Sequence, residues 1–498
     1  MKKNFFRLVA LGLLGVTIWA CSDKFLESTP QNGTFTDASV FQTKADFNAY
    51  LFGAYSEMQG GGDGSGASQW LLYPGLIMQD ITPVDEIGKV LPSFLVSGAG
   101  ETRNYWTVLY KVIGRSNLIL ERIAVAPAKI TTAEKTLIEG EAKFLRGFSY
   151  FMLARAFGNV PMPLASYTAE QNSLECTPEA KVWEQAVADF ADAATKLPNR
   201  GGWGPENVGR ATKGAALGYL AFAQMHRKDW PNAAKATTDL IGLGEYKLLP
   251  DVRAVFSAKV ENTEESVFEV QYRAVDNGAF VWSGQPNNGQ LMNEWTSPRN
   301  LGDQYAPFGG WGEGVMNKKL ADSFEKGDLR RSKLVVAPGE TYKGEAMTQA
   351  VTIPKNIAQS RSAFSTKYWL GPDKNYLGSQ NLIQLRYAEV LLNYAEILFE
   401  SGNPTAAYQQ LNLVRKRAGL TDRAMSASRE QFITDLLKER RWEFNFEPNL
   451  WFHYTRLGRA GKFLQDEYGI SFNNSWNKLP IPQADRDQNP KLCQNDGY

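Results

Sequence analysis

The sequence predicts a mostly α-helical protein, in which antiparallel helix pairs form a scaffold and long loops and a few short strands form one face. Three segments carry this prediction: residues 131–156, 211–241 and 382–447. In each of them apolar residues recur at intervals of three and four, which places an apolar face along a helix. Only short turns separate the helices of the last two segments, so we expect those helices to pack antiparallel.

Helix caps divide residues 382–447 into three helices. Gly402 and Asn403 end the first of them. Pro404 opens the second, because the N–H group of a first helical residue has no partner within the helix. Ser428 and Gln431 have the spacing of a capping box and start the third. The sequence therefore predicts three helices that fold back on one another.

The N-terminal half adds further predicted helices. Thr131 and Glu134 form a second capping-box pattern at the start of residues 131–156. The segment Pro231-Asn232-Ala233-Ala234 repeats the pattern of Pro404-Thr405-Ala406-Ala407, which favours helix-turn-helix units of the tetratricopeptide type. Other helices are expected over residues 37–58, 106–117, 179–197, 211–226 and 231–241.

The sequence pattern changes from helical to strand-like and loop-like at about residue 264. Residues 266–272 alternate like a strand, whereas residues 276–314 fit neither a helical nor a strand period and are predicted to be loop. No Gly/Ser linker, charge block or low-complexity run divides the chain. We therefore expect one domain over residues 37–498, with a loop-rich insert at about 264–380.

The N-terminus has the pattern of an export signal. Basic residues precede an apolar run over residues 8–19, which is too short to span a bilayer but typical of a signal-peptide core. The run ends in Ile18-Trp19-Ala20-Cys21, which is similar to a lipobox. We expect a lipoprotein signal peptide at residues 1–20 and a lipidated tether at residues 21–36, anchored through Cys21. The alternative is a plain secretory signal with an incidental cysteine.

Composition excludes several functional classes. The 54 Lys and Arg residues nearly balance the 53 Asp and Glu residues, so no basic surplus exists to bind a nucleic acid backbone. Histidine occurs only as His226 and His453, which leaves almost no material for a zinc site or a histidine-based triad. We expect His226 to be a polar helix cap and His453 to be structural. No Gly-rich phosphate-binding motif is present, so no cofactor or metal is expected.

Three glutamates in the last helix of residues 382–447 raise the question of catalysis. Glu439, Glu443 and Glu447 share one helical face, as a glycosidase-type acid pair could. Arg440 and Arg441 are interleaved with them and can offset their repulsion. We therefore favour a salt-bridged helix, and we expect no enzyme activity.

Cysteine usage is sparse. After Cys21, only Cys176 and Cys493 remain, far apart in the sequence. This excludes a disulfide framework and leaves either one bridge or two buried thiols. Two buried thiols are the interpretation that we favour.

Several stretches resemble the SusD/RagB family of outer-membrane nutrient-binding lipoproteins. They are "EAKFLRGFSYFMLARAFGNVPM", "LRYAEVLLNYAEILFESG", "LNLVRKRAGL", "LLKERRWEFNFE" and "LWFHYTRLGR". The resemblance runs from Cys21 to Tyr498, and several motifs in one order are more specific than any single motif.

The resemblance implies a SusD-like fold and a role in polysaccharide utilization. Such a protein is lipid-anchored in the outer membrane and exposed at the cell surface. There it binds a nutrient, most often an oligosaccharide, and delivers it to a SusC-like TonB-dependent transporter for uptake. Two alternatives stay open: a binder of peptides or another nutrient, and, less favoured, a glycan-cleaving enzyme.

Aromatic and amide side chains gather in the predicted loops. The apolar face of a sugar ring stacks on an indole, while its hydroxyls need amide, carboxylate or guanidinium partners. The family's ligand contacts come from variable loops, so no binding residue is carried over from the resemblance. Each Trp could instead fix a loop to the core. The candidate ligand-binding residues are Trp70, Trp282, Asn287, Asn288, Trp295, Arg299, Tyr305 and Trp311.

Overall fold

The computed structural model describes residues 40–59, 78, 80–82, 100–168, 173–257, 259–273, 289–298, 310, 312, 314–342, 345–346, 361–369 and 378–498. The longer helices are α3 (Lys44–Met58), α5 (Gly100–Ala124), α6 (Thr132–Phe157), α7 (Glu179–Lys196), α8 (Lys213–His226), α9 (Trp230–Gly242), α14 (Tyr387–Glu400), α15 (Pro404–Arg417), α16 (Arg429–Phe444), α17 (Leu450–Arg456) and α18 (Ala460–Tyr468). Shorter helices are α10 (Met292–Thr296), α11 (Lys318–Ser323), α12 (Leu329–Leu334) and α19 (Gln483–Gln488), and the 3-10 turns are η4 (Arg200–Trp203), η5 (Pro205–Asn207), η6 (Val252–Phe256) and η7 (Asn474–Asn477).

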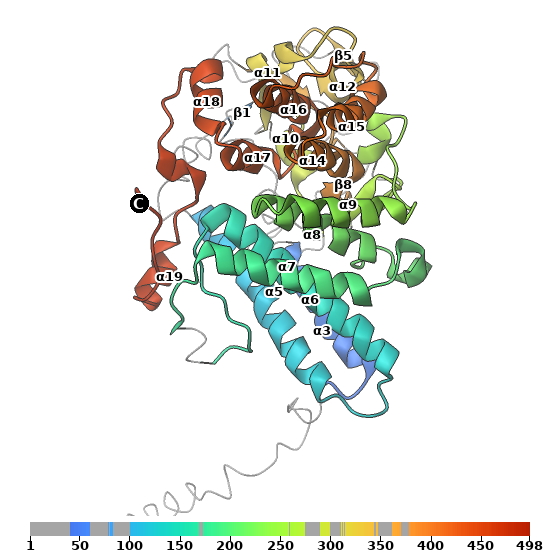
Figure 1. Cartoon of the computed structure of the whole chain (residues 1–498), viewed down its shortest axis with the longest axis vertical. Coiled ribbons are helices and arrows are strands. Elements are labelled where there is room, and N and C mark those ends of the chain that lie inside the picture. The colour runs from blue at the N-terminus through green and yellow to red at the C-terminus, as the bar shows by residue number, and fades with distance from the viewer. Residues whose placement is uncertain are drawn as a thin grey trace, which may run out of the picture.

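The helices pack as a series of neighbours, which confirms the predicted helical scaffold. Figure 1 shows α3, α5, α6 and α7 side by side at one end of the molecule, α8 and α9 across its middle, and α14 to α16 at the other end. Each helix from α5 to α9 packs on the next one along the chain, α9 packs on α14, and α14 packs on α15. One apolar core runs through the series, from Phe41 to Leu492.

Capping side chains set several helix starts as predicted. Thr131 and Glu134 form the capping box of α6, and the Ser428 hydroxyl accepts a hydrogen bond from the Gln431 N–H at the start of α16. The first helix in the described part of the chain, α3, begins at Lys44, so the predicted start at residue 37 is wrong. Thr43 caps α3 in a box with Asp46, and Phe41 has a φ of 67°, which no α-helix accommodates.

Among the described residues, short strands form three small sheets. β1 (Ile81–Thr82), β3 (Val315–Asn317), β7 (Arg361–Ser365) and β4 (Val335–Val336) are neighbours in that order, and all their pairings are antiparallel. The predicted strand over residues 266–272 is confirmed as β2 (Ser266–Val270), which pairs with β8 (Leu382–Arg386). β5 (Thr341–Tyr342) pairs with β6 (Glu345–Ala346).

The helix α10 corrects the prediction that residues 276–314 are loop throughout. It is only five residues long, so it shows no helical period in the sequence. Contacts with the rest of the fold hold it: Trp295 is buried in the core, and the Trp369 indole N–H donates a 3.0 Å hydrogen bond to the Thr296 carbonyl.

The three glutamates form an ion-paired core, as expected, but with different partners, and only Glu439 and Glu443 lie on α16 because the helix ends at Phe444, before Glu447. The basic residues Arg330, Arg386, Arg415, Arg417 and Lys367 come from other segments and bind Glu439, Glu443 and Glu447. Burial raises the pKa of Glu443, but the guanidiniums of Arg417, Arg386 and Arg330 outweigh it and hold this pKa well below its usual range. The interleaved arginines point elsewhere: Arg441 binds Asp80, and Arg440 donates to Asn393.

Both histidines are structural. His453 lies in the core, with its Nε2 atom 2.9 Å from Glu389 Oε1 and 3.0 Å from Arg440 Nη1, as the prediction of a structural role required. His226 is not a polar cap: its ring stacks on Trp183 at a centroid distance of 4.4 Å, and its Nε2 has no hydrogen-bond partner among the described residues. Burial lowers the pKa of both rings well below the usual value, so they are neutral at pH 7.

Glu389 gives the core a measurable pH dependence. Burial raises its pKa from 4.5 to about 7. A carboxyl with a raised folded-state pKa stabilises the fold fully below pH 4.5, and this contribution is lost as the pH rises to about 7. Glutamine cannot ionise, so we expect Glu389→Gln to remove this loss of stability. Between pH 4.5 and 8 the free energy of unfolding of the variant should therefore rise by roughly 2–3 kcal/mol relative to that of the parent.

Urea unfolding at a series of pH values measures this gain. Glu396→Gln, in the same helix, is a matched control: burial raises its pKa, but Arg456 outweighs burial and lowers it. We expect that variant to lose stability relative to the parent as the pH rises. If the free energy of unfolding changes with pH in the same way in the parent and in Glu389→Gln, the raised pKa of Glu389 is contradicted.

Cys176 and Cys493 form a disulfide, so the prediction of two buried thiols is wrong. Their Cα atoms lie 5.9 Å apart although 317 positions separate them in the sequence. The C-terminal segment folds back along the end of α6, where the Asn495 side-chain amide donates to the Phe157 carbonyl and that of Asn489 donates to the Leu174 carbonyl. Tertiary contacts of this kind leave no trace in cysteine spacing.

Candidate functional site

One of the eight candidate ligand-binding residues lies in the described part of the chain. Trp295 is in α10, with 8% of its surface exposed, and belongs to the main apolar core. Its role in binding stays a prediction, as does that of the others. Those that lie outside the described residues are Trp70, Trp282, Asn287, Asn288, Arg299, Tyr305 and Trp311.

Described residues that precede two of these segments in the sequence are hydrogen-bonded to each other. Gln59 directly precedes the segment that carries Trp70, and its side-chain amide donates a 2.8 Å hydrogen bond to the Gln271 carbonyl. The Tyr272 hydroxyl donates in return to the Gln59 carbonyl, at 3.2 Å. Gln271 and Tyr272 lie shortly before the segment that carries Trp282, so the described residues that precede the two segments in the sequence are in contact.

A second junction holds the described ends of the segment that carries Arg299, Tyr305 and Trp311. The Gly312 N–H donates to the Ser297 carbonyl at 2.8 Å, which brings the two ends together. Beyond it, β3 pairs with β1, and the Asn317 N–H donates to the Asp80 carbonyl at 2.8 Å. The described residues that follow this segment in the sequence are therefore part of the small four-stranded sheet.

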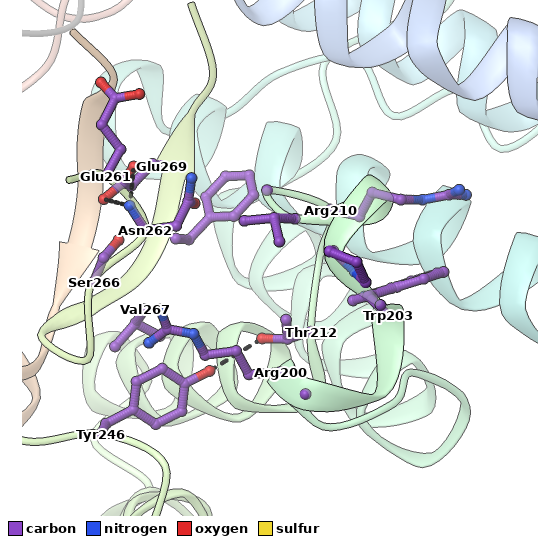
Figure 2. Close-up of a pocket in the computed structure, with 16 residues that line it drawn as sticks. Arg200, Trp203, Arg210, Thr212, Tyr246, Glu261, Asn262, Ser266, Val267 and Glu269 are labelled. Carbon is purple, nitrogen blue, oxygen red and sulfur yellow. Dashed lines mark hydrogen bonds between the residues drawn. The ribbon is translucent and has the colours of Figure 1, made fainter. Parts of the chain in front are cut away.

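A cavity of about 500 Å³ lies between β2 and the turns η4 and η5 (Figure 2). Residues 200–210, "RGGWGPENVGR", form one wall, and Trp203 and Arg210 are its largest side chains. Asn262, Ser266 and Glu269 line the opposite wall. Figure 2 shows Arg200 reaching across the pocket toward β2, next to the ring of Tyr246. The pocket thus combines aromatic rings with hydrogen-bonding groups of both kinds.

The charged groups of the pocket differ in how fully they are paired. Burial raises the pKa of Glu269, against the opposing effects of hydrogen bonds from Ser266, Asn381 and Asn262 and of the charge on Arg200. Among the described residues, no ion pair to Glu269 is found. Arg210, in contrast, forms an ion pair with the buried Glu141 and donates hydrogen bonds to Asn48 and Asn207.

A second hollow of about 390 Å³ adjoins the cavity. Val208, Gly209, Arg210, Phe268 and Glu269 line both spaces, so the two hollows are direct neighbours on either side of these residues. At its far end lie Phe52 of α3 and the junction residues Gln59, Tyr272 and Arg273. We call this combined space the β2 groove.

The ridge between the two hollows depends on Gly209. Its φ is +95°, and a Cβ atom there would lie 2.5 Å from Gln271 Cδ. Arg210 follows, with its guanidinium carbon 4.4 Å from the Trp203 ring centroid and 5.2 Å from that of Phe52. Backbone conformation and stacking therefore fix the shape of the groove in the free protein.

Sequence reasoning missed the groove because its residues are dispersed. Arg200, Trp203, Tyr246 and Glu269 come from three segments without a shared motif, and only pairing of β2 with β8 and packing of α8 bring them together. The one available signal was the run of glycines with Trp203 in residues 200–210, which fits no helical or strand period.

The carboxylates in the pocket do not have a glycosidase arrangement. Glu261 and Glu269 lie on the same side of the pocket (Figure 2), and both accept hydrogen bonds from Asn381, through its backbone N–H at 2.5 Å and its side-chain amide at 2.9 Å. Acid-catalysed glycoside cleavage needs two carboxylates that flank the bond. In the described part of the chain, no group of three or more His, Cys, Asp or Glu side chains is placed to hold a metal ion.

Comparison with known proteins gives matches over nearly the whole chain. The family model described as "SusD family" matches residues 264–498, and the one described as "Starch-binding associating with outer membrane" matches residues 24–223. "Starch-binding protein SusD" of Bacteroides thetaiotaomicron is 30% identical over 445 residues, 74% of each chain. "SusD-like protein P2" of Formosa agariphila is 26% identical over the full length of both chains.

Solved structures share the fold. Surface glycan-binding protein A from Bacteroides thetaiotaomicron, in complex with laminarihexaose, superposes with a TM-score of 0.74 at 24% identity, covering 91% of this chain and 99% of that one. Surface glycan-binding protein A from Bacteroides uniformis has a TM-score of 0.74 at 25% identity, with the same coverage. With the matching family models and the similarity to the starch-binding relative, these likenesses show that the chain belongs to the SusD family.

Proposed function

We propose that the protein is a cell-surface lipoprotein that binds an oligosaccharide and delivers it to a SusC-like TonB-dependent transporter. Capture takes place by stacking and hydrogen bonding, and no bond is broken. The observation that carries this proposal is the similarity to "Starch-binding protein SusD", 30% identical over 74% of both chains. The structure with bound laminarihexaose has the same fold and adds support for a glycan as the ligand.

Two features support export and anchoring. The disulfide between Cys176 and Cys493 suits a protein outside the reducing cytosol. None of the described helices combines the length and apolar character that a bilayer crossing needs. We propose that lipid on Cys21 anchors the chain to the outer membrane. Cys21→Ala should then release it from the membrane fraction, and retention of that variant would contradict lipid anchoring.

The binding surface that we propose is the set of candidate residues from the loops, with Trp70, Trp282 and Trp311 as stacking platforms. Calorimetric titration of the full-length protein in detergent, against a panel of α-glucans, β-glucans and other oligosaccharides, tests it. We expect one glycan class to bind without release of free sugar. Replacing one of these Trp residues with Ala should weaken binding by about tenfold, because a ring face is lost.

Trp295→Ala tests the one candidate Trp that is described, and Trp476→Ala serves as the control in this titration. Trp295 is buried in the core, so its loss should lower the unfolding temperature. Trp476 lies in η7, far along the chain from the predicted loops, and its loss should leave glycan affinity unchanged. Binding of peptides instead of sugars, or of no member of the panel, would overturn the glycan assignment.

A further inference from the structure

The β2 groove contains the guanidinium of Arg200, and only some of its hydrogen-bond donors have a partner among the described residues. Arg200 Nη1 donates a 2.6 Å hydrogen bond to the Thr263 carbonyl. Among the described residues no partner is found for its Nε and Nη2 atoms, although the side chain is partly buried. These donors face a space that is also lined by Glu269. A ligand group that accepts hydrogen bonds there would complete the hydrogen bonding of Arg200.

Glu269 supplies acceptors on the opposite side of the same space. Its side chain is 5% exposed, and burial raises its pKa, although hydrogen bonds from Ser266, Asn381 and Asn262 and the charge of Arg200 act in the opposite direction. Each hydroxyl group both donates and accepts hydrogen bonds. Two neighbouring hydroxyls can therefore accept from Arg200 and donate to Glu269, which satisfies both side chains at once.

The aromatic side chains of the groove are held in place before any ligand arrives. The Trp203 indole N–H donates a 2.8 Å hydrogen bond to the Ala211 carbonyl. The Tyr246 hydroxyl lies 3.1 Å from the Thr212 hydroxyl. Phe52, at the other end of the groove, is 50% exposed. Rings that are already fixed lose little conformational entropy on binding, and they offer apolar surface to the C–H face of a sugar.

We infer that the β2 groove is an additional binding region for sugar residues of a long, neutral oligosaccharide. This inference rests on the proposed function. The groove ends at Gln59 and Arg273, the last described residues before the segments of Trp70 and Trp282 in the sequence, and it adds contacts that only a longer glycan can reach. A paired donor and acceptor of opposite charge favour hydroxyls over a ligand of one charge sign. Affinity should therefore increase with chain length.

Calorimetric titration of the full-length protein with a length series of the bound glycan class, from two to eight sugar units, tests this inference. For the parent we expect affinity to rise by roughly tenfold between the short and the long members, as two hydrogen bonds to charged groups are added. Arg200→Met and Glu269→Gln should each abolish this rise and leave the affinity for the shortest binding member unchanged. Arg227→Met, an exposed arginine outside the groove, should keep the rise.

Each result discriminates between the two proposals. If affinity rises with glycan length in both groove variants as it does in the parent, the inference is overturned and the glycan assignment stands. An equal loss of affinity for short and long members would also overturn it, because the groove would then be no separate region. If no oligosaccharide of any length binds the parent, the proposed function itself fails, and the groove inference with it. Near-identical unfolding temperatures of parent and variants ensure that the comparison reports binding.

Discussion

Arg386→Met is expected to lower the free energy of unfolding by roughly 3–5 kcal/mol, enough to unfold a large share of the protein at moderate temperature. Arg386 is 1% exposed and binds three buried carboxylates: Glu447 at 2.7 Å, Glu265 at 3.0 Å and Glu443 at 2.5 Å. Methionine keeps much of the side-chain volume but leaves these carboxylates short of a counter-charge in a place that water does not reach.

Urea unfolding of Arg386→Met and of Arg429→Met measures the contrast between a buried and a surface ion pair. Arg429 pairs with Glu400 at 2.6 Å, but its side chain is 53% exposed. We expect that variant to change the free energy of unfolding by less than about 1 kcal/mol, because water screens the pair. Similar losses for the two variants would show that the buried network does not depend on Arg386.

Removal of the disulfide, by replacing Cys176 and Cys493 together with Ala, is expected to lower the free energy of unfolding by roughly 2–4 kcal/mol. The bridge closes a loop of 317 positions, so it restricts the unfolded chain strongly. The native contacts of the C-terminal segment, such as the hydrogen bonds of Asn489 and Asn495, remain in the variant.

Chemical unfolding with and without dithiothreitol checks this expectation. The reductant should destabilise the parent to the level of the double variant and leave the double variant unchanged. Cys176→Ala alone should match the double variant. If the parent in reductant unfolds at the same denaturant concentration as the parent without it, the bridge contributes nothing to stability.

The helices could be read from the sequence because their signals are local. The caps at Thr131, Pro404 and Ser428 and the apolar periodicity around them lie within one or two turns, and the structure confirms each of them. The start of α3 was misplaced because the break at Phe41 is a backbone conformation, which side-chain type does not reveal. The helix α10 was missed because five residues are too few for a period.

The ion-pair partners of the buried charged residues could not be predicted from local sequence patterns. The sequence predicted a salt-bridged helix in which Arg440 and Arg441 offset the repulsion of the glutamates. Glu443 instead pairs with Arg330, Arg386 and Arg417, because three distant segments fold against α16. The disulfide and the β2 groove were hidden for the same reason, since each depends on chain segments that are brought together by tertiary packing. The candidate residues in the loops were chosen from composition, and their role remains a prediction to be tested.

The bond between Cys176 and Cys493 also changes what a protease can do to this molecule. Any single cut between these two positions leaves both fragments covalently joined, and the helices on either side of the cut remain packed through the shared core. Residues 264–380, which the sequence predicts to be a loop-rich insert, lie between these two cysteines in the chain. The chain can therefore vary, or even be nicked, in this region without losing its C-terminal half.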